Sequence, residues 1–303
     1  MKILVMGSGG VGGYFGGRLA AGGNDVTFVA RGTHLAAMQK DGLLLDSQIG
    51  NATIKPAKAV LDPAEAGVPE VVMFATKMGD TESAARQLAP VVKEGTSIIT
   101  FQNGVEGPDI IRRVLPGADV HAGVARIASH ISRPGIIEHR SPFARLEMGA
   151  KAGSRIVAFH AACKAAGIDA IQAENIDRNV WLKFALLAPF SGITTLTGHT
   201  TGPLRENPRT LALFEAAVRE VIEVSKAAGT GLTDADVAGV MKVFQSNPPA
   251  MTSSMAHDHR AGKPLELEWL SGAVMRIGER HNVSTPTHRF IWQALAIDAG
   301  GKR

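Results

Sequence analysis

A glycine-rich turn near the N-terminus limits the fold more than any other feature of the chain. Residues 7–12 read Gly-Ser-Gly-Gly-Val-Gly, a G-x-G-x-x-G spacing. An apolar run at residues 3–6 precedes the turn, a helix-like segment follows it, and a second strand-like run covers residues 25–30. Strand, glycine turn, helix and strand within about 30 residues are typical of the first unit of a dinucleotide-binding sheet. Because 34 glycines produce chance matches, the flanking elements favour a nucleotide site more than the spacing does.

The residues of this turn have distinct tasks in such a unit. Gly7 permits the tight turn, Gly9 lets a pyrophosphate approach the backbone, and Gly12 allows close packing between helix and strand. The free N–H groups of the first helical turn, which includes Gly10 and Val11, then face the phosphate oxygens. We therefore expect these five residues to bind the cofactor.

The residue after the second strand usually decides which cofactor is bound, since an acid there would bind a ribose 2′-hydroxyl. This chain has Arg31 instead, without a neighbouring carboxylate. A guanidinium can pair with a 2′-phosphate through its planar fork. We expect NADP(H), and the plain alternative is a solvated loop arginine.

The α/β pattern continues beyond the second strand. Strands are predicted at 71–75 and 96–101, with a helix near 80–88. Lys77 and Asn103 each follow one of these strands, at the edge where open α/β sheets bind ligands. Both are expected to face the cofactor, although a solvated lysine and an Asn-Gly turn would look the same. A hairpin with arms at 124–131 and 135–138, a helix at 154–166 and a strand at 168–172 complete the first domain.

From about residue 175 the strand signals stop. Helical patterns follow at 178–188, 208–228, 234–245, 251–260, 265–281 and 286–298. Pro208, Pro264 and Pro286 lie near the starts of three of them, where proline fits the first turn. The sequence therefore predicts an α/β fold. A Rossmann-type, doubly wound sheet occupies residues 1–174, and an all-helical domain over 175–303 contacts the substrate.

One helix of the second domain carries a charge in an apolar setting. Lys183 lies within the segment Asn-Val-Trp-Leu-Lys-Phe-Ala-Leu-Leu, residues 179–187. A buried and unpaired ammonium is strongly destabilising. Lys183 therefore needs a carboxylate partner, a route to water or a role in a functional cleft, and the residues alone leave these three open.

A polar stretch later in the chain adds further candidates. Pro264 is expected to begin a helix and to place Glu266 in its first turn, where acids are common for electrostatic reasons alone. His257 and His259 flank Asp258, but they lack a third ligand at a recognised spacing and point apart on a helix. We expect no metal site.

Composition restricts the partners and the compartment. The formal net charge is +4 without a basic cluster, so nucleic-acid binding is not indicated. The single cysteine, Cys163, fits a reducing compartment. No stretch approaches the roughly 20 apolar residues that span a bilayer, and the N-terminal apolar run is too short for a signal peptide. We expect a soluble, cytoplasmic protein.

The ordered set of motifs resembles the ketopantoate reductase (2-dehydropantoate 2-reductase) family over essentially all 303 residues. The motifs that carry the resemblance are the turn at 7–12, Arg31, Lys77, Asn103, Lys183, Ser254 and Glu266. The resemblance implies NADPH-dependent reduction of a 2-keto acid, as 2-dehydropantoate is reduced to pantoate in pantothenate biosynthesis. It also implies that Arg31 and Lys77 neutralise the 2′-phosphate end of the cofactor.

The resemblance assigns the reaction to four further residues. Lys183 would be the general acid, and Asn103 would position substrate or nicotinamide. Glu266 would bind a substrate hydroxyl and tune Lys183, while Ser254 would bind polar groups of the substrate. The chemistry is sound in itself, because hydride addition to a ketone leaves negative charge on oxygen, which an ammonium stabilises and then protonates.

The chain departs from the family pattern one and two helical turns after the lysine. The family usually carries asparagines there, whereas this chain has Leu187 and Ser191. Leucine cannot form a hydrogen bond and serine reaches less far than an amide, which changes selectivity. Ser191 is kept as a candidate substrate-binding residue. A less hydroxylated or bulkier 2-keto acid than ketopantoate suits the apolar position better.

Three interpretations remain open. The leading one is an NADPH-dependent 2-keto acid reductase, acting on ketopantoate or on a different 2-keto acid. The second is a 3-hydroxyacid dehydrogenase, which combines similar domains with a catalytic lysine. The third is a non-catalytic NADP(H)-binding sensor, which would need none of the second-domain polar residues. A homodimer through the helical domain rests on analogy alone.

Overall fold

The computed structural model describes residues 1–149 and 154–301. Contacts divide the chain into two compact units. Unit 1 comprises Met1–Asn103 and Gly107–Ile176, and unit 2 comprises Gly104–Glu106 and Asp177–Arg303. The chain therefore contributes one short segment to unit 2 before it returns to unit 1, an excursion that the sequence did not predict.

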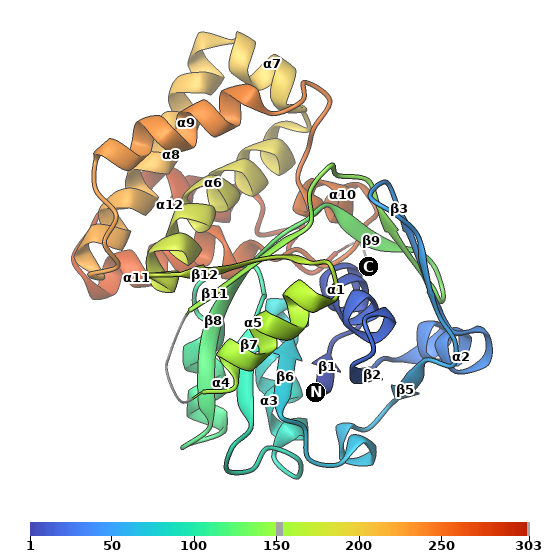
Figure 1. Ribbon diagram of the computed structural model, residues 1–303. Coiled ribbons are helices and arrows are strands. Elements are labelled where there is room, and N and C mark those ends of the chain that lie inside the picture. The colour runs from blue at the N-terminus through green and yellow to red at the C-terminus, as the bar shows by residue number, and fades with distance from the viewer. Residues whose placement is uncertain (150–153, 302–303) are drawn as a thin grey trace. The chain divides into compact units, whose positions relative to one another are not determined.

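An eight-stranded sheet forms the centre of unit 1, in the order β12-β11-β8-β7-β6-β1-β2-β5 (Figure 1). Its strands are β1 Lys2–Met6, β2 Asp25–Val29, β5 Lys58–Val60, β6 Val71–Phe74, β7 Ser97–Thr100, β8 Asp119–Arg126, β11 Arg145–Gly149 and β12 Asp169–Ala173. The run from β5 to β8 is parallel, and β11 pairs antiparallel with β8. The parallel run has the strand order of a Rossmann sheet. The predicted fold class, such a sheet followed by a helical region, is confirmed.

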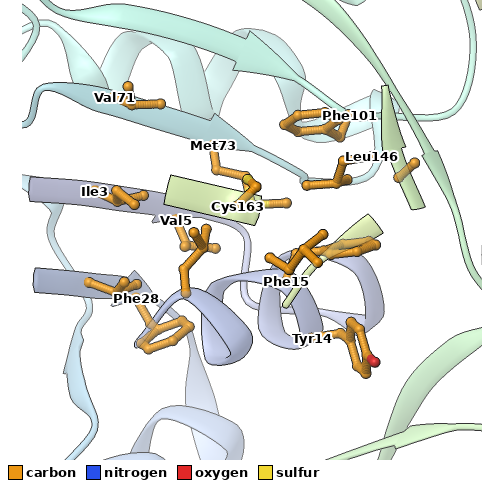
Figure 2. Close-up of a cluster of buried hydrophobic side chains, with 14 of the residues drawn as sticks. Ile3, Val5, Tyr14, Phe15, Phe28, Val71, Met73, Phe101, Leu146 and Cys163 are labelled. Atoms are coloured by element: carbon orange, nitrogen blue, oxygen red, sulfur yellow. The ribbon is translucent and has the colours of Figure 1, made fainter. Parts of the chain in front are cut away.

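Helices cover both faces of this sheet. On β1, Ile3 and Val5 belong to one buried cluster, whereas Leu4 and Met6 belong to another. The first cluster includes side chains of α1 and α5, as Figure 2 shows, and the second includes side chains of α3 and α4. The helices and 3₁₀ turns of unit 1 are α1 Gly10–Ala21, α2 Gly32–Asp41, η1 Pro63–Ala66, η2 Met78–Asp80, α3 Thr81–Leu88, α4 Gly107–Val114 and α5 Ile156–Ala165. A strand buried on both faces has a continuous apolar sequence, which is why β1 was predictable.

A second, four-stranded sheet lies in unit 1, in the order β4-β3-β10-β9. Its strands are β3 Leu43–Ser47, β4 Ala52–Ile54, β9 Ser129–Arg133 and β10 Ile136–His139. The β9–β10 hairpin was predicted, but its first arm, at 124–131, was wrong. That arm joins the end of β8, which is in the large sheet, to the start of β9. The strands β3, β4, β5 and β11 were not predicted, because runs of three to five residues carry too little periodicity.

Glycines let α1 pack closely against both sheets. A Cβ on Gly12 or Gly16 would lie 2.9 or 2.7 Å from Val5 of β1. A Cβ on Gly13 or Gly17 would lie 2.9 Å from a β10 side chain or 3.0 Å from a β3 side chain. Each pair is one helical turn apart and forms a strip without side chains. Glycine costs about 1 kcal/mol in a helix interior, and this close packing offsets that cost.

The described part of unit 2 from Asp177 onward contains helices and no strand. The elements are α6 Ile176–Thr197, α7 Thr201–Glu206, α8 Pro208–Ala227, α9 Ala235–Ser246, α10 Ser254–Arg260, η3 Leu267–Trp269, α11 Ser271–Arg280 and α12 Pro286–Ala294. Pro208 and Pro286 occupy the first turns of α8 and α12, as predicted. The start of the helix predicted over residues 265–281 was wrong. Residues 267–269 form a 3₁₀ turn, and Glu266 is the residue before it, not part of an α-helical first turn.

The core helix of unit 2 is α6. It was predicted to end at residue 188, but it continues through Pro189 for a total of 22 residues. By length and composition it could cross a membrane, so the expectation that no stretch approaches this length was wrong. However, 61% of its most apolar window is buried inside the protein, and Ala185, Ala188 and Ile193 have no exposed surface. It is a buried core helix.

His288 is fully buried in unit 2. Its Nε2 donates to the carbonyl oxygen of Ala217 at 3.1 Å, so Nδ1 accepts from Ser271 Oγ, also at 3.1 Å. Burial lowers the pKa of His288 to about 4. The folded protein therefore holds this imidazole in its neutral form under conditions where an exposed histidine binds a proton.

We predict that this histidine makes folding acid-sensitive. Between about pH 7 and about pH 5 the unfolded chain binds a proton at residue 288 and the folded chain does not. The free energy of unfolding should fall by about 2 kcal/mol over this range from His288 alone. Urea unfolding of the native protein and of His288→Gln at both pH values measures this term. An identical pH dependence in the two proteins would contradict the prediction.

Candidate active site

The carboxyl ends of four parallel strands form one edge of unit 1. The register pairs Met6 with Val29 on one side and with Phe74 on the other, and pairs Phe74 with Thr100. The last residues of β2, β1, β6 and β7 therefore lie in one row, which spans about 14 Å at the usual strand spacing. Ligands of open α/β sheets bind at this edge where the strand order reverses, which here is between β1 and β6.

The glycine turn follows β1 directly. Gly7 has a φ of +98°, which side chains rarely permit, and a Cβ there would lie 2.8 Å from the backbone nitrogen of Thr76, after β6. A Cβ on Gly9, by contrast, would meet no atom of the described chain within 4 Å. Gly7 is thus held against the neighbouring loop while Gly9 faces open space. This arrangement fits a pyrophosphate that approaches the backbone at Gly9.

The N-terminus of α1 favours an anion. Gly9 is its N-cap and supplies no side chain, and the first turn carries no acidic residue. The N–H groups at this end lack intrahelical partners, and the helix dipole is positive here. Gly10 has a second task, because a Cβ on it would lie 2.3 Å from the carbonyl oxygen of Ser129 on β9. The glycine turn therefore packs between the loop after β6 of the large sheet and β9 of the small sheet.

His34 connects the glycine turn to the helix that begins after Arg31. Arg31 is exposed and is the N-cap of α2. The Nε2 of His34 donates to the carbonyl oxygen of Ser8 at 3.1 Å, and its Nδ1 accepts from the N–H of Gly135, in the β9–β10 turn, at 3.0 Å. Burial lowers the pKa of His34, which favours the neutral form that this pattern requires. The sequence did not single out this histidine, since one polar residue on a helix produces no pattern.

Gln102 connects the ends of β6 and β7. Its Nε2 donates to the carbonyl oxygen of Thr76 at 3.0 Å and to a threonine hydroxyl at the start of α3 at 2.8 Å. Its Oε1 accepts from Thr100 Oγ1 at 2.9 Å. Thr76 precedes Lys77, which is exposed, and Gln102 precedes Asn103, which is half-buried. One amide therefore fixes the backbone beside both predicted cofactor residues, a role that the sequence did not reveal.

In unit 2, three of the predicted positions lie on one face of α6. Lys183, Leu187 and Ser191 are spaced four residues apart. Lys183 and Leu187 are half-buried, and the neighbouring Trp181 and Phe184 are buried. Ser191 has no exposed surface, and its Oγ has no hydrogen-bond partner among the described residues. The apolar surroundings expected for Lys183 are present, while a contact between Ser191 and a substrate stays a prediction.

The segment that carries Ser254 contacts α6. Ser253 is the N-cap of α10, since its Oγ accepts from the N–H of Ala256 at 3.0 Å. The same hydroxyl is 2.8 Å from Thr194 Oγ1 on α6. Ser254, the exposed first residue of α10, therefore lies beside the C-terminal half of α6.

The segment that carries Glu266 continues into α11, which contacts α6. Glu266 is half-buried and precedes η3, after which α11 begins at Ser271. A Cβ on Gly192 of α6 would lie 3.4 Å from Ser271 Oγ. Within unit 2, α6 therefore contacts both the N-cap of α10, next to Ser254, and α11, which follows the turn after Glu266.

Comparison with known proteins identifies the family. The family described as ketopantoate reductase PanE/ApbA matches residues 3–153, and the one described as ketopantoate reductase PanE/ApbA C terminal matches residues 175–297. The chain belongs to the ketopantoate reductase PanE/ApbA family. The resemblance found in the motifs is confirmed, and the protein is an oxidoreductase of this family.

Relatives in the family match along the whole chain. An uncharacterized oxidoreductase of Bacillus subtilis is 28% identical over 300 residues and covers 98% of each chain. A 2-dehydropantoate 2-reductase of Mesorhizobium japonicum is 29% identical, over 95% of this chain and 94% of the relative. The crystal structure of a PanE/ApbA family ketopantoate reductase from Ralstonia eutropha JMP134 gives a TM-score of 0.91 at 28% identity, over 99% of this chain and 98% of that one.

Two glycine variants should show that Gly12 is tightly packed in the turn whereas Gly9 faces open space. Gly12→Ala should lower the free energy of unfolding by about 1–3 kcal/mol, because its Cβ would lie 2.1 Å from the carbonyl oxygen of Gly7. Gly9→Ala should change it by less than about 1 kcal/mol, because its Cβ meets open space. Urea unfolding compares the two variants. An equal loss in both would contradict the packing described for the turn.

Proposed function

We propose that the protein uses NADPH to reduce a 2-keto acid to the 2-hydroxy acid in the cytoplasm. Residues 1–174 would hold the dinucleotide and residues 175–303 would contact the substrate. The observation that carries the proposal is Lys183, a half-buried amine on the apolar α6 of a ketopantoate reductase family member. Cys163, the one cysteine, is buried and its thiol pKa is raised to about 12, so no disulfide chemistry is expected.

The residues of unit 1 fit a dinucleotide that carries a 2′-phosphate. Gly7, Gly9 and the first turn of α1 would hold the pyrophosphate, at a helix end without acidic side chains. Arg31 is exposed, two residues after the end of β2, and has no acid beside it in the sequence, so it would pair with the 2′-phosphate. Lys77, on the same edge of the sheet, would add a second positive charge.

The residues of unit 2 would carry the proton transfer. The reduced nicotinamide supplies hydride to the ketone carbon. Lys183 would stabilise the negative charge that develops on the oxygen and then donate its proton there. The apolar neighbours of this lysine would limit the access of water when substrate is bound, which would strengthen its interaction with that charge. Glu266 would orient the amine and would hold a hydroxyl of any substrate that carries one. Asn103 would position substrate or nicotinamide, and Ser254 would bind the carboxylate.

The face of α6 indicates the class of 2-keto acid. Leu187 is half-buried and one helical turn after Lys183. Its methyl groups offer no partner to a substrate hydroxyl, and a hydroxyl left without a partner weakens binding. An apolar, branched side chain on the substrate would pack there instead. We therefore propose a 2-keto acid with such a side chain, while 2-dehydropantoate, the substrate in the names of several relatives, is the alternative.

Replacing the proposed acid should remove most of the activity. Lys183→Ala should lower kcat by about 10²–10⁴-fold, the usual contribution of a general acid, with NADPH affinity retained. Lys242→Ala on α9 is the matched control, because Lys242 is exposed and should not affect the rate. The assay follows NADPH oxidation with ketopantoate and with 2-keto acids that carry apolar branches.

The same assay distinguishes the alternatives. A rate in Lys183→Ala equal to that of the native protein would exclude this lysine as the acid. Tight NADPH binding by the native protein without turnover of any 2-keto acid would instead support a sensor. Faster turnover of 3-hydroxyacids than of 2-hydroxyacids in the reverse direction would support a 3-hydroxyacid dehydrogenase.

Arg31 should set the cofactor preference. Removal of a charge-assisted contact with the 2′-phosphate in Arg31→Leu should weaken NADPH binding by about 10–100-fold and leave NADH binding nearly unchanged. Fluorescence titration of both nucleotides measures the change. Lys40→Leu at the other end of α2 is the control. Equal affinity of the native protein for NADPH and NADH would contradict the proposal that Arg31 binds the 2′-phosphate.

A further inference from the structure

A cluster in unit 2 is centred on Arg276, in α11. Its Nη2 donates to Glu106 Oε2 at 2.7 Å and to the backbone oxygen of Glu268 at 2.8 Å. Its Nη1 pairs with the carboxylate of Glu268. The guanidinium carbon also lies 5.5 Å from the centre of the Trp269 ring. One side chain therefore holds two segments that are far apart in the sequence, at Glu106 and at Glu268.

The first segment is the short excursion of the chain into unit 2, Gly104–Glu106. Val105 packs against the hydrophobic core of unit 2. Glu106 contacts Arg276 and, at 3.4 Å, Arg280 Nη2, and only 18% of its side chain is exposed. This segment follows Asn103 immediately, so its anchoring fixes the chain on one side of a predicted site residue.

The second segment is η3, which follows Glu266 immediately. Glu268 accepts hydrogen bonds from Arg276 and from Trp292 Nε1, the latter at 2.7 Å. The buried Leu267 anchors the same turn in the core of unit 2. Glu266 therefore lies at the edge of a turn whose orientation depends on the same guanidinium.

We propose that Arg276 is a positioning residue for the reaction, acting through Glu106 on Asn103 and through Glu268 on Glu266. This inference rests on the proposed function. Neither carboxylate needs to touch the substrate. The planar fork of arginine suits the task because it binds a carboxylate and a carbonyl oxygen in one fixed geometry, which a lysine does not reproduce. Small displacements of groups that align a substrate have large effects on rate.

The test compares four variants with the native protein in the NADPH oxidation assay. Arg276→Met removes the fork but keeps the aliphatic stem, and Arg276→Lys keeps the charge. Glu106→Gln removes one carboxylate without changing its shape, and the double variant joins Arg276→Met with Glu106→Gln. Arg289→Met is the matched control, because it removes another ion pair of α11, the Arg289–Glu279 contact at 2.7 Å, in which neither Glu106 nor Glu268 takes part.

Arg276→Met should lower kcat/KM by about tenfold or more, mainly through kcat, with NADPH affinity within about threefold of native. Glu106→Gln should act in the same direction, and Arg276→Lys should recover part of the loss. The double variant should lose less than the product of the two single losses, because the residues act as one unit. Arg289→Met should keep native kcat/KM.

Several results would overturn the proposal. One is native kcat/KM in Arg276→Met, and another is losses that multiply in the double variant. A third is a fall in kcat/KM that only follows the unfolded fraction, as for a residue that merely stabilises the fold. If Arg276→Met does not fold, native kcat/KM in Glu106→Gln overturns the proposal. If the native protein reduces no 2-keto acid, the proposed function is wrong, and the role inferred for Arg276 is rejected with it.

Discussion

The close packing of α1 against β1 is the constraint on which unit 1 depends. Gly12 lies so near Gly7 that no side chain fits between them, and this contact sets where the glycine turn leaves the sheet. The neighbouring face of the same helix packs against the second sheet. Because the turn is fixed from both sides, this packing sets the direction of its N–H groups and leaves the space at Gly9 open. The cofactor side of the site therefore depends on the absence of side chains.

Within each unit, polar contacts between distant segments hold the loops that carry predicted site residues. His34 links the glycine turn to α2, and Gln102 links the loops after β6 and β7. In unit 2, the bond between Thr194 and Ser253 joins α6 to α10, and Arg276 joins two loops next to predicted site residues. His34 and Gln102 bind backbone groups next to strand ends. Arg276 binds a backbone oxygen and two carboxylates, and Thr194 binds the side chain that caps α10. The residues proposed to touch ligands are thus held by others that do not.

Local sequence patterns predicted the fold well where the residues of an element alone determine which structure it forms. The run at residues 3–6, the glycine turn and the prolines at 208 and 286 carry local signals, and the structure places them in a buried strand, a helix start and two first turns. Two strands of the second sheet, β3 and β4, were missed because such short strands are stabilised by packing against α1 and carry little pattern of their own. The end of α6 was missed because burial outweighs the loss of one hydrogen bond at Pro189. Candidate ligand contacts could be named from motifs, but Arg276 and Gln102 could not, since their partners are remote in the sequence.

The proposed function depends on proton transfer from the amine of Lys183 to the oxygen of the ketone that is reduced. The most direct test is a crystal structure of the protein with NADPH and a non-reactive 2-keto acid analogue. We expect Nζ of Lys183 to lie within hydrogen-bond distance of the analogue's keto oxygen, about 2.6–3.2 Å. An analogue bound with its keto oxygen on another donor, and with Nζ directed to solvent, would contradict it.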